Sequence, residues 1–107
     1  MESVVGRSEF TDKLQSAGDK LVIADFYADW CAPCKMVGPK FAELIKNFPD
    51  VVILTINLDD NEELGQDYGI ESMPTFVLLK HSEVVATYVG TNMDKLKKVI
   101  EQQLNPL

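Results

Sequence analysis

Two almost unbroken apolar runs, residues 21–28 and 51–58, set the architecture of this chain. A strand with one face in water alternates between apolar and polar side chains, whereas these runs are apolar at nearly every position. Strands of this kind are typical of the centre of a sheet that helices cover on both faces. The sequence therefore predicts an α/β fold built around a buried sheet.

Helical spacing is found on both sides of the first run. A helix that carries Phe10, Leu14 and Ala17 on one face is predicted before it, with Ser8 as the N-cap and Gly18 as the terminator. A second helix is predicted over residues 34–48, where apolar side chains again recur every three or four positions. Pro39 falls inside this helix and should kink it.

Two more helices are predicted in the second half of the chain. Asp60 and Glu63 resemble a capping box for a short helix that Gly69 ends. The last helix has one apolar stripe, made of Met93, Leu96, Ile100 and Leu104.

The remaining strands complete a mixed sheet. Residues 4–5 suggest a short edge strand, and residues 75–79 and 84–89 form two strands joined through residues 80–83. Strand–helix–strand units imply parallel pairing, and the closing hairpin implies an antiparallel edge. We therefore expect a central mixed five-stranded sheet flanked by four helices, in a single domain over residues 1–107.

The charge and hydropathy of the chain argue against several classes of partner and location. The formal net charge of −7 argues against nucleic acid and anionic membranes, since both require a basic face. No stretch approaches the roughly 18 apolar residues of a membrane helix. The N-terminus also lacks the basic and apolar regions of a secretory signal. We expect a cytoplasmic protein.

Cys31 and Cys34 are the two cysteines of the chain and form a C-x-x-C motif. Two cysteines are too few for the disulfide framework of a secreted protein. The pair is therefore a redox dithiol, half of a zinc site, or an incidental structural pair. Structural zinc usually has four ligands, and the single histidine, His81, lies far along the chain in a predicted turn, so we expect no metal.

The motif opens the predicted kinked helix, and this position favours redox chemistry. Unpaired N–H groups and the helix dipole stabilise a thiolate at a helix N-terminus, so the pKa of the thiol falls there. Pro33 is tolerated in the first turn. Cys34 shares a face with core residues, whereas Cys31 precedes the helix. We expect Cys31 to be the exposed nucleophile and Cys34 the buried resolving thiol.

Asp25 is the second chemical signal, because it interrupts a strand that is otherwise apolar. Burial of a carboxylate without a partner raises its pKa. Asp25 lies six residues before Cys31, on the strand that leads to it, so it is a candidate proton acceptor for Cys34. The alternative is a carboxylate paired for packing alone. Pro74 directly precedes a strand, and by itself it indicates only a strand start or a cis peptide bond.

Together these motifs resemble the thioredoxin family over essentially the whole chain. They are Trp-Cys-x-Pro-Cys-Lys after a strand that bears Asp, Met-Pro-Thr-Phe further on, and Val-Gly before the last helix. The resemblance implies the thioredoxin fold and the reduction of protein disulfides by dithiol–disulfide exchange.

The resemblance also implies roles at the matching positions. Cys31 matches the attacking cysteine, Cys34 the resolving cysteine and Asp25 the buried acid–base residue. Pro74 matches the cis-proline beside the disulfide, and Pro39 the proline that kinks the active-site helix. The positions that match the substrate-binding rim are Trp30, Met73 and Gly90, together with Pro74 itself.

Partners follow from the same resemblance. It implies recycling by thioredoxin reductase and NADPH, with peroxiredoxins, ribonucleotide reductase and methionine sulfoxide reductases as acceptors. It implies a monomer with no bound cofactor other than the redox-active Cys31–Cys34 disulfide. An oxidase or isomerase remains a rival, although such relatives usually carry His between the cysteines. A binding module with incidental thiols is a second rival.

The chain departs from the family pattern at four places. Ala32 replaces the usual Gly, which leaves the redox potential open, and Thr55 stands where many relatives carry Lys or Glu near the buried Asp. His81 and Ser82 occupy a turn that often contains Gly. Ser72 stands where some animal thioredoxins have a further cysteine, which excludes disulfide-linked dimers by that route.

Overall fold

The computed structural model describes residues 1–105 and contains one five-stranded sheet with helices on both faces. The elements in chain order are β1 (Glu2–Ser3), α1 (Arg7–Ser16), β2 (Val22–Tyr27), α2 (Ala32–Ile45), β3 (Val52–Asn57), the 3₁₀ helix η1 (Leu58–Asp60), α3 (Glu62–Asp67), β4 (Thr75–Lys80), β5 (Glu83–Val89) and α4 (Met93–Leu104).

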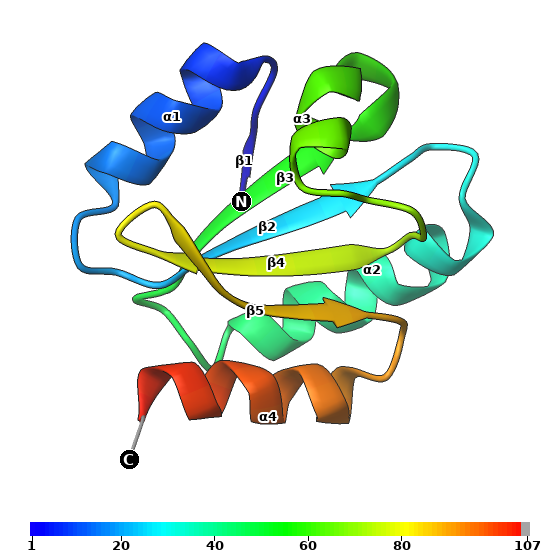
Figure 1. The fold of residues 1–107 in the computed structure, drawn as a ribbon. Coiled ribbons are helices and arrows are strands. Elements are labelled where there is room, and N and C mark those ends of the chain that lie inside the picture. Colours follow the sequence, from blue (N-terminus) through cyan, green and yellow to red (C-terminus); the bar gives the residue numbers. More distant parts are fainter. Residues whose placement is uncertain (106–107) are drawn as a thin grey trace.

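The sheet is mixed, as predicted, with strand order β1-β3-β2-β4-β5. β1 and β2 both pair parallel to β3, whereas β4 runs antiparallel to β2 and β5 antiparallel to β4. α1 and α3 lie on one side of the sheet, and α2 and α4 lie on the other (Figure 1). The described residues thus form the predicted mixed five-stranded sheet flanked by four α-helices.

β2 divides its side chains between two cores. Val22, Ala24 and Phe26 pack with α1 and α3 on one face, where Phe10, Leu14 and Leu64 are buried. Ile23 faces the other way and packs with residues of α2 and α4 such as Phe41 and Ile100. A strand with apolar residues on both faces therefore lies at the centre of the sheet, as the sequence predicted.

The N-terminal elements differ from the prediction. The edge strand is Glu2–Ser3 and not residues 4–5, and Val4 follows it with its side chain buried. α1 begins after Gly6, so Ser8 is not its N-cap. Gly6 has a φ of 93°, a backbone conformation that favours glycine.

Asn61 explains these differences. Its side-chain oxygen accepts a hydrogen bond from the Gly6 N–H at 2.8 Å, and its Nδ2 donates to the carbonyls of Val4 and Asn57. Asn61 is 5% exposed and is also the N-cap of α3, so the capping box predicted at Asp60 is wrong. The hydrogen bonds of this buried side chain to three backbone groups, and not the local capping preference, therefore determine where the two helices begin.

α2 is shifted toward the N-terminus relative to the predicted range 34–48. It begins at Ala32 and ends at Ile45, and Pro39 lies inside it. Residues 46–48 instead form tighter turns, in which each N–H bonds a carbonyl three residues back. Of the described residues, no helix has the length and apolar character needed to cross a membrane.

The β4–β5 turn is strained at both central positions. His81 has a φ of 52° and Ser82 a φ of 66°, as in a type I′ hairpin turn, which favours Asn-Gly. The side chain of His81 adds little stability, because it is exposed and its Nε2 lies 3.6 Å from the carboxylate of Asp19, which is also exposed.

We expect the double change His81→Asn/Ser82→Gly to raise the free energy of unfolding by roughly 1–2 kcal/mol, since both new residues tolerate positive φ. Urea unfolding of the oxidised protein measures this effect. Ser82→Ala is the control, because it keeps the β-carbon and should give no gain. Equal stability of the double variant and the wild type would show that the turn stores no such strain.

Candidate active site

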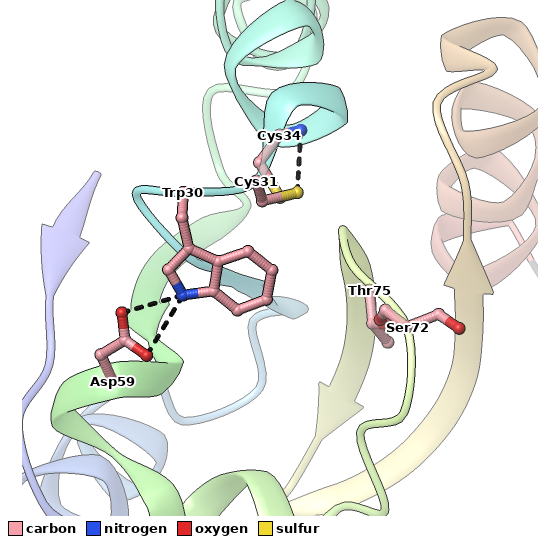
Figure 2. Close-up of a disulfide and its surroundings, with 6 residues drawn as sticks. All are labelled: Trp30, Cys31, Cys34, Asp59, Ser72 and Thr75. Carbon is pink, nitrogen blue, oxygen red and sulfur yellow. Dashed lines mark hydrogen bonds between the residues drawn. A yellow bond between two sulfur atoms is a disulfide. The ribbon is translucent and has the colours of Figure 1, made fainter.

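Cys31 and Cys34 lie where β2 passes into α2. Cys31 is the N-cap of α2, and its Sγ accepts a hydrogen bond from the Cys34 N–H at 3.2 Å (Figure 2). The two residues form a disulfide, with their Cα atoms 5.3 Å apart. Pro33 occupies the first turn of the helix, where its missing N–H removes no helical hydrogen bond.

This position decides the chemistry of the Cys31 sulfur. At the N-cap it lies at the positive end of the helix dipole, beside N–H groups that have no helical partner. Both features favour a thiolate over a thiol once the disulfide is reduced. The pairing of the sulfurs favours the redox interpretation of the motif over the zinc one. The structure of residues 1–105 shows no group of three or more His, Cys, Asp or Glu placed to hold a metal ion.

The expected difference in exposure between the two cysteines is absent. Cys31 is 5% exposed and Cys34 is 9% exposed, so the prediction of an exposed Cys31 is wrong for the disulfide form. Cys31 is covered because the cysteines form a small cluster with Ala28, against which Tyr27 and Met73 pack. The two sulfurs differ instead in their surroundings, since Cys31 has the N-cap contact and Cys34 lines a cavity.

That cavity has a volume of about 240 Å³ and joins Cys34 to Asp25. Thr55 and Pro74 also line it. Thr55 is the partner of Asp25 on β3, so it occupies the position expected from the sequence. Burial raises the pKa of Asp25 to about 7, as the interrupted apolar run predicted. A carboxyl group with this pKa can exchange a proton near neutral pH.

Four residues predicted to form a rim lie near the pair. Pro74 follows a cis peptide bond after Met73, and its carbonyl accepts a hydrogen bond from the Gly90 N–H at 3.2 Å. Gly90 has a φ of 138°, a backbone conformation that other residues rarely adopt, and a β-carbon there would approach the Tyr88 hydroxyl to 2.9 Å, so this position favours glycine. Trp30 is 69% exposed.

The structure adds two residues that the sequence did not predict, Asn57 and Asp59. The Trp30 Nε1–H donates to the Asp59 carboxylate at 3.2 Å (Figure 2), and the Asn57 Nδ2 donates to Asp29 at 3.3 Å. The sequence feature that could have identified these two residues is the parallel pairing expected between the two apolar runs. The loops that follow parallel neighbours leave the sheet at the same edge, so polar residues after residue 56 had to lie beside Trp30.

The sheet order and a disulfide at the N-terminus of α2 define a thiol–disulfide oxidoreductase with the thioredoxin fold. The sequence matches the family described as Thioredoxin over residues 2–102. The chain belongs to the thioredoxin family.

Curated relatives agree with this assignment. Thioredoxin-T of Drosophila melanogaster is 46% identical over 100 residues, which are 92% of this chain and 64% of that protein, so the chain spans about two-thirds of that relative. Thioredoxin of Ophiophagus hannah is 38% identical over 97% of this chain and 100% of its own length. Among solved structures, Fasciola hepatica thioredoxin superposes with a TM-score of 0.91 at 31% identity, over 95% of this chain and 98% of that one.

The family and the paired cysteines establish the reaction. The protein is a protein-disulfide reductase that works by dithiol–disulfide exchange through Cys31 and Cys34.

The raised pKa of Asp25 makes stability depend on pH. In the unfolded chain this carboxyl ionises near its ordinary pKa of 3.8, but in the folded protein it keeps its proton up to about pH 7. The folded state therefore binds more protons between these values, and the wild type loses stability as the pH rises through them.

We expect Asp25→Asn, which cannot ionise, to raise the free energy of unfolding of the oxidised protein by roughly 2–4 kcal/mol near pH 8 and by almost nothing near pH 3.5. Denaturant unfolding at both pH values measures the difference. A gain of equal size at both values would assign the effect to packing and not to ionisation. Turnover should fall in the same variant, most of all in the step that resolves the mixed disulfide.

Proposed function

We propose that Cys31 attacks the substrate and Cys34 resolves the mixed disulfide with Asp25 as its proton acceptor. The observation that carries this assignment is the different surroundings of the two sulfurs. The Cys31 Sγ accepts the Cys34 N–H at the tip of α2, whereas Cys34 lines the cavity that Asp25 also lines. The first environment stabilises a thiolate, and the second supplies a base to a thiol.

The reaction runs in two exchanges. The Cys31 thiolate attacks one sulfur of the substrate disulfide, so a Cys31–substrate disulfide forms and the other substrate sulfur leaves as a thiolate. Asp25 then takes the Cys34 proton. The Cys34 thiolate attacks the Cys31 sulfur, and the second substrate thiolate leaves. The substrate gains two electrons, and the protein is left with the Cys31–Cys34 disulfide.

Trp30, Met73, Pro74 and Gly90 form the proposed substrate-binding rim. Met73 packs against the cysteine cluster, and the Pro74 carbonyl bonds the Gly90 N–H. Trp30 adds an exposed aromatic surface at the same edge. A substrate chain laid across this rim would bring its disulfide to Cys31.

Thioredoxin reductase returns the disulfide to the dithiol with electrons from NADPH, so the protein carries electrons from that enzyme to its substrates. Peroxiredoxins, ribonucleotide reductase and methionine sulfoxide reductases are the proposed acceptors. The peroxiredoxin proposal has support from a chain of a solved structure that concerns the thiol resolving mechanism in yeast mitochondrial 1-Cys peroxiredoxin via glutathione/thioredoxin systems. The chain superposes on it with a TM-score of 0.88 at 29% identity, over 95% of this chain and 94% of that one. We further propose a cytoplasmic monomer of one domain that binds no metal or organic cofactor.

Reduction of insulin by the protein, with thioredoxin reductase and NADPH, tests the function. No turnover beyond the reductase alone would favour a binding module with incidental thiols. The redox potential separates the reductase from an isomerase. A value near that of protein disulfide isomerase would contradict our proposal, and a value near the cytosolic glutathione potential or below agrees with it.

The roles of the cysteines predict opposite phenotypes for their serine variants. Cys31→Ser should abolish disulfide reduction, because no nucleophile remains at the tip of α2. Cys34→Ser should still attack, and should accumulate covalent complexes with substrates that dithiothreitol releases. Non-reducing electrophoresis with intact-mass analysis detects them. Complexes formed by Cys31→Ser, with none from Cys34→Ser, would reverse the assignment.

Replacement of Ala32 should change the stability of the fold but not the redox potential. It is the first residue of α2, where Ala is favoured over Gly by up to about 1 kcal/mol, whether the cysteines are oxidised or reduced. Only a difference between the two forms moves the potential, by about 30 mV for each 1.4 kcal/mol. Ala32→Gly should lower stability slightly and shift the potential by less than about 20 mV. Glutathione equilibration and denaturant unfolding of both forms measure this. A shift of about 40 mV or more would contradict it.

A further inference from the structure

The loops that follow β2 and β3 leave the sheet side by side. Tyr27 and Asn57 are the last paired residues of these parallel strands. The first loop carries Asp29 and Trp30 into the active site, and the second continues as η1, which contains Asp59. Side chains join the two loops at two points, between Asn57 and Asp29 and between Asp59 and Trp30.

Trp30 depends on the second of these contacts for its orientation. Trp30 is 69% exposed, so close packing does not fix its rotamer. The indole N–H donates to both oxygens of Asp59, at 3.2 and 3.4 Å (Figure 2). An exposed aromatic side chain without such a bond changes rotamer on the picosecond to nanosecond timescale. The position of the Asp59 carboxylate therefore sets the position of the indole.

Asn57 holds both partners of this contact. Its Oδ1 accepts the Asp59 N–H at 3.0 Å and caps η1, which fixes the segment that carries Asp59. Its Nδ2 donates to the Asp29 Oδ2 at 3.3 Å, which fixes the residue directly before Trp30. One amide side chain thus spans the two loops. An amide suits this place because it has both a donor and an acceptor, which a carboxylate lacks.

We propose that Asn57 is a positioning residue for substrate binding. It orients Trp30 because its side chain holds Asp29 and Asp59 in fixed positions relative to each other. This inference rests on the proposed role of Trp30 in the substrate rim. Asn57 itself lies outside the cysteine cluster and outside the lining of the Asp25 cavity, and of its two partners only Asp29 lines that cavity. Its loss should therefore weaken substrate binding and leave the exchange chemistry intact.

Asn57→Asp tests the proposal. The new carboxylate has the size of the amide and still accepts the Asp59 N–H, but it cannot donate to Asp29 and repels it. Trp30 is the single tryptophan of the chain, so intrinsic fluorescence reports its mobility directly. We expect lower fluorescence anisotropy and stronger quenching by acrylamide. In insulin reduction with excess reductase, KM should rise roughly threefold to tenfold, and kcat should stay within about twofold.

Two further variants make the test specific. Asp29→Asn/Asn57→Asp exchanges donor and acceptor at the same contact with no net change in charge, and it should restore both the anisotropy and KM. Asn47→Asp is the matched control, because the Asn47 Nδ2 donates to the Leu44 carbonyl at the end of α2, away from this edge. It should leave both readouts at the wild-type values.

The outcomes separate this inference from the function on which it rests. If Asn57→Asp leaves the anisotropy and KM unchanged, or if the exchanged pair fails to restore them, Asn57 does not position Trp30. If Trp30→Ala leaves KM unchanged, Trp30 has no place in the substrate rim and that part of the proposed function fails. A raised KM in Trp30→Ala with a normal KM and anisotropy in Asn57→Asp would overturn the Asn57 inference alone.

Discussion

Burial of β2 on both faces is the constraint on which the other features depend. The strand lies between β3 and β4, and its side chains alternate between the two cores. Because it is held along its whole length, the chain that leaves its C-terminal end has a fixed origin and direction. The loop to α2 is short, so the N-terminus of that helix and the Cys31 sulfur are placed by the same packing. A rigid element thus determines the position of the reactive group.

Asp25 shows that this strand serves two opposed requirements. Its position faces α2, where an apolar side chain would stabilise the fold, and burial there raises the pKa of its carboxyl to about 7. The same burial makes the carboxyl a proton acceptor at neutral pH beside Cys34. Stability is therefore lost at the residue where the chemistry needs a base. Thr55, the β3 neighbour of Asp25, carries no charge, and desolvation by burial is what raises the pKa of Asp25.

Local patterns predicted the elements and the chemical residues but not the contacts between distant segments. The apolar runs were sufficient to predict the order of the elements. The position of Cys31 and Cys34 at a helix N-terminus was sufficient to predict a redox-active dithiol. The start of α1 was missed because Asn61, far along the chain, bonds the Gly6 N–H. The burial of Cys31 was missed because Met73, far along the chain, packs against the cysteine cluster. The Trp30–Asp59 contact likewise joins residues that no short-range periodicity relates.

The reversal of strand direction at β4 explains why so many site residues meet at one edge. β2 and β3 end there because they are parallel. β4 runs the other way, so it begins there, and Thr75 pairs with Phe26 directly after Pro74. β5 reverses again and ends there, which brings Val89 beside Thr75 and Gly90 to the Pro74 carbonyl. With a parallel β4, Pro74 would lie at the opposite edge, about 20 Å away for a strand of this length. The mixed sheet is therefore a requirement of the site, because it alone places the proline, the glycine and the dithiol together.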